Sequence, residues 1–155
     1  MPGRIDAKLA ELGLTLPAPR PPGGNYVPFV VSGKLVFLAG QVSALADGTK
    51  VVGKLGAGVT IEQGQQGARL CALNLFTALR NACGGDLDRV ARCVSVRGFV
   101  NCTPEFPDQP KVINGASDLI AAVFGEAGKH ARTAIGVAAL PSGLAVEVDA
   151  VFELA

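Results

Sequence analysis

The chain has 155 residues, of which 49% are hydrophobic and 17% charged. This composition predicts one domain with a substantial core and excludes a disordered chain, which would be poorer in apolar residues. With 14 basic and 13 acidic residues the formal net charge is +1, so the overall charge gives no support to a nucleic-acid partner.

The first 22 residues predict a short helix and an arm. Ile5, Leu9 and Leu12 repeat at helical spacing, which indicates a helix over 4–12. The proline-rich stretch that follows cannot be regular structure, because proline lacks a backbone donor and fixes φ. We therefore expect an arm on the surface of the domain, with residues 23–154 as the core of the domain.

Two strands and a long helix should come next. The stretches 26–31 and 35–42 are rich in β-branched and aromatic residues, and a short glycine-containing turn separates them, which predicts a hairpin. Thr60 and Gln63 have the pattern of a capping box, so a helix should begin there. The glycine pair at 84–85 should end it.

A strand and a second long helix follow. The strand is expected over 89–101, where alternation places Val94 with the other valines on one face and Cys93 on the opposite face. The helix should begin between residues 103 and 110, where Thr-Pro and Asp offer start signals, and should end at Gly125.

The chain should close with a hairpin of strands 133–139 and 144–152. Two helices on one face of a mixed sheet bury only that face well, which gives an α+β fold. An opposite face that also carries small and apolar residues would predict oligomerisation. We place the following residues on that opposite face: Ala134, Gly136, Ala138 and Val151.

Neither metal nor redox chemistry is indicated. The four cysteines form no C-x-x-C pair, and His130 is the only histidine. The single histidine also argues against an activated cysteine nucleophile. No segment is apolar enough to cross a bilayer and the first residues contain no signal core, so we expect a cytoplasmic protein with reduced thiols and no membrane contact.

Arg132 is the first candidate binding residue. It stands where a helix gives way to a strand, beside small residues, and its planar guanidinium matches the geometry of a carboxylate. The alternative is that Arg132 pairs with Glu126 or Asp118 for structural reasons. The residue types alone favour this alternative, because structural ion pairs resemble sites.

Glu147 is an acid within an otherwise apolar strand. Alternation places it with Asp149 and Glu153 on the face opposite the core. A carboxylate at a half-buried interface can hold and polarise a water molecule, and the alternative is an acid that simply faces solvent.

Asn114 and His130 are further candidates. Asn114 precedes a glycine inside a helix, a locally costly pair that indicates either a function or a packing constraint. His130 is either a pH-sensitive base or a hydrogen-bonding residue beside the start of a strand.

These residues together resemble the YjgF/RidA family, the reactive intermediate imine deaminases. The similar signature block comprises residues 131–137, 140–141 and 146–148. Tyr26, the Gly-Gln pair that begins at Gly40, and Asn114 also stand where the family has them. The resemblance extends over 23–154, and the N-terminal helix and arm are similar to a longer branch of the family, so 1–155 would form one such domain.

The resemblance implies a chorismate-mutase-like fold, a mixed sheet with two long helices on one face. Three such subunits would pack their sheets into a central barrel with three clefts between subunits, so a homotrimer is expected. In the cleft, Arg132 would hold the carboxylate of a 2-imino or enamine acid and Glu147 would position the hydrolytic water, without metal or organic cofactor. The remaining lining residues would be Tyr26, Gly40, Asn114 and Ala134.

Three positions depart from the best-studied deaminases. Ala134 stands in place of a cysteine, Ala39 in place of a serine before the Gly-Gln pair, and His130 in place of a proline. Since the backbone at position 134 is what usually contacts the ligand, the mechanism does not need the thiol, but the pocket shape and the substrate would change.

Three hypotheses for function follow. The first is hydrolysis of a small reactive imine to a keto acid and ammonia, which the presence of both Arg132 and Glu147 favours. The second is a non-catalytic trimer that binds a small carboxylate as a sensor or carrier, which the nearby substitutions favour. The third, an endoribonuclease, ranks last, because the chain has a near-neutral charge, one tyrosine and no tryptophan.

Overall fold

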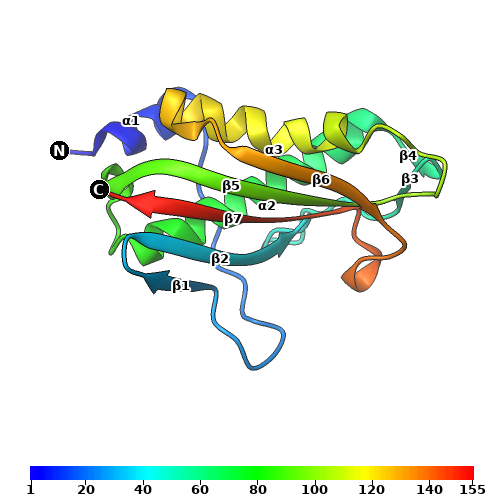
Figure 1. The fold of residues 1–155 in the computed structure, drawn as a ribbon, viewed down its shortest axis with the longest axis horizontal. Helices are drawn as coiled ribbons and strands as arrows, with labels where there is room; N and C mark the ends of the chain where they lie inside the picture. Colours follow the sequence, from blue (N-terminus) through cyan, green and yellow to red (C-terminus); the bar gives the residue numbers. More distant parts are fainter.

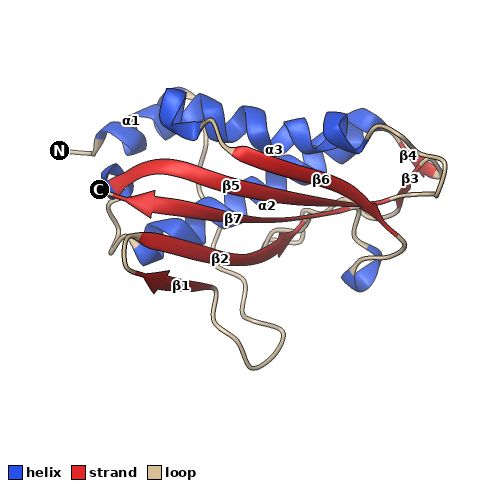
Figure 2. Ribbon diagram, in the orientation of Figure 1, coloured by secondary structure: helices blue, strands red, loops and turns tan.

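A computed structural model describes residues 1–155 as a five-stranded sheet with helices packed on one of its faces (Figures 1 and 2). The strand order is β1-β2-β7-β5-β6, in which only the β5–β6 pair is parallel. The predicted α+β fold with a mixed sheet is therefore confirmed. The strands are β1 Phe29–Ser32, β2 Leu35–Val42, β5 Val90–Asn101, β6 Ala131–Val137 and β7 Val146–Leu154.

The helices lie close to their predicted positions. They are α1 Arg4–Glu11, α2 Ile61–Ala82 and α3 Gln109–Phe124, and short 3-10 turns occupy η1 Leu87–Arg89, η2 Gly125–Gly128 and η3 Pro141–Gly143. A separate two-stranded sheet is formed by β3 Lys54–Leu55 and β4 Gly58–Val59. None of the helices has the length and apolar character that crossing a membrane requires.

The ends of the long helices follow the sequence signals. The Thr60 hydroxyl accepts a hydrogen bond from the Gln63 amide at 3.1 Å, and the Gln63 side chain accepts one from the Thr60 amide at 2.9 Å, which confirms the capping box. At the other end Gly84 and Gly85 have positive φ. Gly125, with φ of 63°, ends α3 as predicted, because a left-handed residue at this position favours glycine.

The core lies between the sheet and the two long helices. Every second residue of β7 from Val146 to Leu154 is buried, as the alternation predicts. The Phe152 ring lies 5.6 Å from the Phe124 ring, which in turn lies 5.7 Å from the Phe76 ring. These contacts join β7, α3 and α2 at one aromatic cluster.

The N-terminal arm is fixed to the surface of α2 and the segment after β2. The Thr77 hydroxyl donates to the Pro17 carbonyl at 2.8 Å, and the Arg20 guanidinium donates to the Ala44 carbonyl at 3.1 Å. The arm then turns back into β1, which begins at Phe29 rather than at Tyr26, because Pro28 cannot donate to the sheet.

The predicted hairpin of the last two strands is wrong. β7 lies between β2 and β5 in the middle of the sheet, whereas β6 pairs only with β5 and forms an edge (Figure 1). The connection between β6 and β7 contains η3 and is long enough to pass β5. Period-2 alternation shows which residues face the core, but it does not show which strand is the neighbour.

Face assignments in two strands, β5 and β6, are also corrected. A register shift between Cys93 and Ser95 interrupts the alternation of β5, so Cys93 is fully buried and Val94 is only half-buried. In β6, Ala134 pairs with Gly98, and a Cβ at Gly98 would clash with Ile113 of α3. Ala134 therefore faces the helices, and so does Gly136, which pairs with the buried Val100.

The open face of the sheet is nevertheless apolar in part, through other residues. Val30 and Val151 both pair with Phe37, which is 45% exposed, and Ile135 is 46% exposed. Val151 was correctly placed on this face, and Ala138 lies beyond the end of β6.

Candidate functional site

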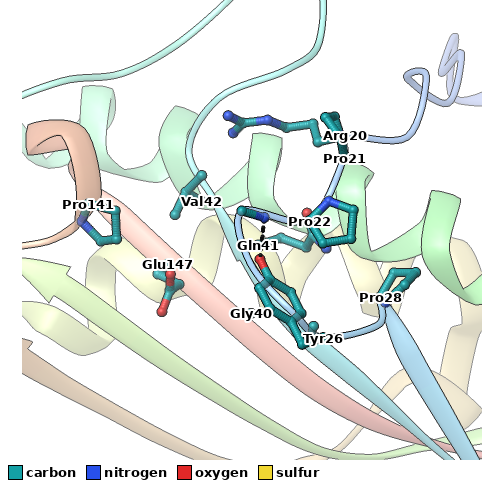
Figure 3. Close-up of a pocket in the computed structure, with 12 residues that line it drawn as sticks. Arg20, Pro21, Pro22, Tyr26, Pro28, Gly40, Gln41, Val42, Pro141 and Glu147 are labelled. Atoms are coloured by element: carbon teal, nitrogen blue, oxygen red, sulfur yellow. Dashed lines mark hydrogen bonds between the residues drawn. The ribbon is translucent and has the colours of Figure 1, made fainter.

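A pocket of about 230 Å³ opens where the N-terminal arm meets the open side of β2 and β7 (Figure 3). Three predicted site residues, Tyr26, Gly40 and Glu147, line it. Gln41 and Pro141, which belong to the segments that resemble the family, contribute as well, and so does Arg20, which the sequence did not single out. A lone charge among prolines was the available signal for Arg20.

A bulge in β2 brings Gly40 over Glu147. The pairing of β2 with β7 shifts register between Leu38 and Gln41. A Cβ at Gly40 would lie 3.2 Å from the carboxyl carbon of Glu147, so a larger residue would press on the carboxylate. The missing side chain thus leaves the acid accessible from the pocket.

Glu147 is half-buried and has no hydrogen-bond or ion-pair partner within the chain. Burial, followed by repulsion from Asp149, raises the pKa of its carboxyl above the usual value. Asp149 itself is held by Arg97, whose Nε and Nη2 lie 3.0 and 2.6 Å from the two carboxylate oxygens. An unpaired acid with a raised pKa in a pocket has the properties of a general base.

Tyr26 stands at the rim of the same pocket. Its hydroxyl accepts a hydrogen bond from the Gly23 amide at 3.1 Å, drawn as a dashed line in Figure 3, and the residue is 55% exposed. The hydrogen bond closes the loop between the arm and β1, so Tyr26 both shapes the loop and offers an aromatic surface to a ligand.

Arg132 lies on the opposite side of the sheet, on the edge strand β6. It pairs with the buried Val96, so its side chain points toward α3. Its Nη1 donates to the Asn114 side-chain oxygen at 2.8 Å and to the Ser117 hydroxyl at 3.2 Å, and its Nη2 donates to the Pro110 carbonyl at 3.4 Å. Asn114, predicted for the site, therefore contacts Arg132 directly.

No carboxylate lies within 4.0 Å of Arg132, so the alternative structural ion pair is wrong. Glu126 pairs instead with Lys129 at 2.9 Å. Arg132 is exposed, with a full positive charge and only uncharged acceptors. Such a guanidinium can bind an anion without first breaking a salt bridge.

A single chain keeps the predicted residues in two separate groups. Arg132, Asn114 and Ala134 lie on the α3 side of β6, while Glu147, Tyr26 and Gly40 line the pocket on the open face. Glu147 pairs with Phe99, which pairs with Ile135, so the register places Glu147 and Arg132 on opposite faces of the sheet.

The remaining polar groups do not form a metal or thiol site. No three His, Cys, Asp or Glu side chains are close enough together to hold a metal ion. All four cysteines are buried, and burial raises the pKa of Cys93 to about 12. A thiol with such a pKa is not ionised near neutral pH, so it is a poor nucleophile.

The architecture defines an α+β protein with a helix-covered sheet, an open face and a pocket on that face. Residues 6–151 match the family described as "YjgF/chorismate mutase-like, putative endoribonuclease", and the chain belongs to this family. Among curated proteins, Protein TCP17 of Trypanosoma cruzi is 50% identical over 153 residues, which cover 98% of this chain and 95% of that protein.

Solved structures agree with this assignment. The Atu1372 protein of Agrobacterium tumefaciens is 44% identical, with a TM-score of 0.90 over 97% of this chain and 92% of its own. A "putative endoribonuclease" of Shewanella oneidensis is 32% identical, with a TM-score of 0.93 over 98% of this chain and 100% of its own. TdcF of Escherichia coli, solved with bound serine, is 21% identical with a TM-score of 0.62 over 91% and 96%, and shares the fold.

Proposed function

We propose that the protein hydrolyses small 2-imino or enamine acids to keto acids and ammonia, in a cleft formed by two subunits. The observation that carries the proposal is Arg132, an exposed guanidinium held in place by three uncharged acceptors and free of any carboxylate. A substrate carboxylate supplies the missing counter-charge, and a bidentate contact fixes its orientation.

The second half of the proposed site is Glu147. Its carboxylate faces a cavity and has a raised pKa, which suits a base that must take a proton near neutral pH. In the proposed reaction a water bonded to Glu147 attacks the imine carbon, and Glu147 accepts the water proton. The C–O bond forms as the C=N π bond breaks, and Glu147 passes the water proton to the nitrogen, which gives a carbinolamine. The hydroxyl proton then moves through Glu147 to the nitrogen, the C–N bond breaks to release ammonia, and the C=O bond forms.

The separation of the two groups requires a second chain. Arg132 and Glu147 lie on opposite faces of one sheet, so one substrate contacts both only if they come from neighbouring subunits. The exposed Phe37 and Ile135 supply an apolar surface for such an assembly. We infer a homotrimer with the open faces packed around a central barrel.

Two other activities are less well supported. The family and several relatives are described as endoribonucleases, but the net charge of +1 provides no general attraction for RNA. A trimer that only binds carboxylates would need Arg132 and the acceptors that hold it, all of which one chain supplies. It would not need the unpaired carboxylate of Glu147 in the pocket.

The test is ammonia release from freshly generated imino acids, with pyruvate binding measured in parallel. Arg132→Ala should nearly abolish both, whereas Glu147→Gln should keep binding and lower kcat by about a hundredfold or more, because glutamine is a far poorer base. Matched controls are Arg92→Ala, an exposed arginine of β5, and Glu153→Gln, on the same face of β7. Pyruvate binding without any ammonia release would indicate the carrier function, and full activity of Arg132→Ala would contradict the proposal.

A further inference from the structure

Arg132 is the end of a chain of hydrogen bonds that leads back to the only histidine. The Ser117 hydroxyl, which accepts from Arg132 Nη1 at 3.2 Å, lies 2.8 Å from His130 Nε2. The other ring nitrogen, Nδ1, lies 2.7 Å from the Gly128 carbonyl oxygen. The network therefore connects η2 and α3 to Arg132 of β6, the side chain that holds the substrate in the proposed function.

For a neutral imidazole ring, the chemistry of these groups fixes the direction of each bond. A carbonyl oxygen only accepts, so His130 must carry its proton on Nδ1. In the neutral ring Nε2 is then an acceptor, and the Ser117 hydroxyl must donate to it. The lone pairs of the Ser117 oxygen are left for Arg132, which only donates. Every member of the network thus has one consistent role.

The fold holds both ends of this network. Ser117 follows Asn114 by about one helical turn, so both side chains lie on one face of α3. Both accept hydrogen bonds from the same guanidinium nitrogen, Nη1 of Arg132. Gly128 is buried, and a Cβ there would lie 2.5 Å from the Ile120 carbonyl oxygen. Tight packing against α3 therefore fixes the carbonyl that orients the His130 ring.

The donors that remain on Arg132 define how an anion can bind. Of five N–H groups, two on Nη1 serve Asn114 and Ser117, and one on Nη2 serves Pro110. One N–H on Nε and one on Nη2 are left. Arg97 uses the same two nitrogens to hold Asp149 side-on, at 3.0 and 2.6 Å.

We propose that His130 and Ser117 are positioning residues that hold Arg132 so that its Nε and Nη2 edge receives the substrate carboxylate side-on. This inference rests on the proposed function of Arg132. Ser117 and His130 touch only the guanidinium and its supports, so their loss affects the orientation of the anchor and leaves the chemistry at Glu147 unchanged. The contact between Arg132 and the substrate carboxylate is equally strong in the ground state and in the transition state. Weakening this contact should therefore raise KM and have little effect on kcat.

The first test uses the single histidine as a reporter. Nitrogen NMR of protein labelled at histidine gives the signals of a single imidazole ring, that of His130. We expect these signals to show the Nδ1–H tautomer in the free protein. Addition of pyruvate should shift the ring nitrogens in the wild type and leave them unchanged in Arg132→Ala. An Nε2–H tautomer, or a ring that does not respond to pyruvate bound by the wild type, would overturn the inference.

The second test separates this inference from the proposed function. Ser117→Ala and His130→Ala should raise KM and the Kd for pyruvate about three- to tenfold, the effect of losing one hydrogen bond, with kcat within about twofold. Ser117→Thr keeps a hydroxyl and His130→Gln keeps an acceptor, so both should restore most of the affinity. Ser32→Ala, an exposed serine at the end of β1, is the control and should behave as wild type.

The outcomes distinguish the two claims. If Arg132→Ala loses binding while Ser117→Ala and His130→Ala keep wild-type KM, the positioning role is wrong and the proposed function stands. If Arg132→Ala itself keeps wild-type binding, the proposed function fails and this inference fails with it.

Discussion

Arg132 and Glu147 differ in how much of their environment one chain supplies. Arg132 is surrounded by acceptors from α3 at 2.8 to 3.4 Å, so its orientation is set before any ligand arrives. Glu147 faces its pocket without a partner and keeps a raised pKa. Preorganisation suits a binding group, and an unpaired carboxylate suits a base.

The activity of the proposed enzyme should therefore depend on pH through Glu147. The base must be ionised, so kcat/KM should fall as the pH drops through its pKa, which lies above that of an ordinary glutamate, about 4.3. Asp149→Asn removes the repulsion and should move this acid limb to lower pH, while the larger contribution of burial remains. A pH–rate profile checks this. An acid limb that does not move in Asp149→Asn would contradict the assignment of Glu147.

At the scale of elements, the local signals predicted the helices and the succession of long strands along the chain, but not the order of the strands in the sheet. The capping box at Thr60 and the glycine at 125 are short-range features, and their geometry needs no tertiary information. The pairing of β7 with β5 and the bulges in β2 and β5 depend on contacts distant in sequence. Alternation alone therefore misplaced Cys93 and Ala134.

The candidate site was also predictable only in part, because it too depends on contacts between residues that are distant in sequence. Resemblance to a family indicated Arg132, Glu147, Tyr26, Gly40 and Asn114, and the structure divides them between two faces. No periodicity indicates that the proline-rich arm closes the pocket over Glu147. Likewise, the bond from Ser117 to His130 arises from the packing of η2 against α3.

The pair of Asn114 and Gly115 in α3 has two separate explanations. Asn114 binds Arg132, while Gly115 lies where α3 crosses α2, with a Cβ position only 2.2 Å from the Gln65 carbonyl oxygen. Gly115→Ala should destabilise the protein by about 1 to 3 kcal/mol, although alanine is the better helix former, because it forces the helices apart. Denaturant unfolding measures this, with Asn114→Ala as a control expected to retain wild-type stability. A stabilised Gly115→Ala would contradict the close helix crossing.

At the scale of the whole molecule, the open face of the sheet is the surface that another chain would cover. Phe37 and Ile135 are each close to half exposed, although they lie in the middle of strands. We expect a trimer in sedimentation at micromolar concentration, and Phe37→Asp should weaken it because a charge would be buried without a partner. Lys34→Asp in the β1–β2 turn is the control. A wild-type protein that sediments as a monomer would refute the assembly.

The most direct test of the central claim is complementation between two inactive variants. Arg132→Ala and Glu147→Gln each lack one half of the proposed site, and the two halves should come from neighbouring subunits. Co-expressed in equal amounts and assembled at random, they should combine an intact Arg132 with an intact Glu147 in one cleft of every mixed trimer. Over all trimers this is about a quarter of the clefts, so about a quarter of the wild-type ammonia release should return. If both residues served one active site within the same chain, the mixed trimers would stay as inactive as the separate variants, and the account would be wrong.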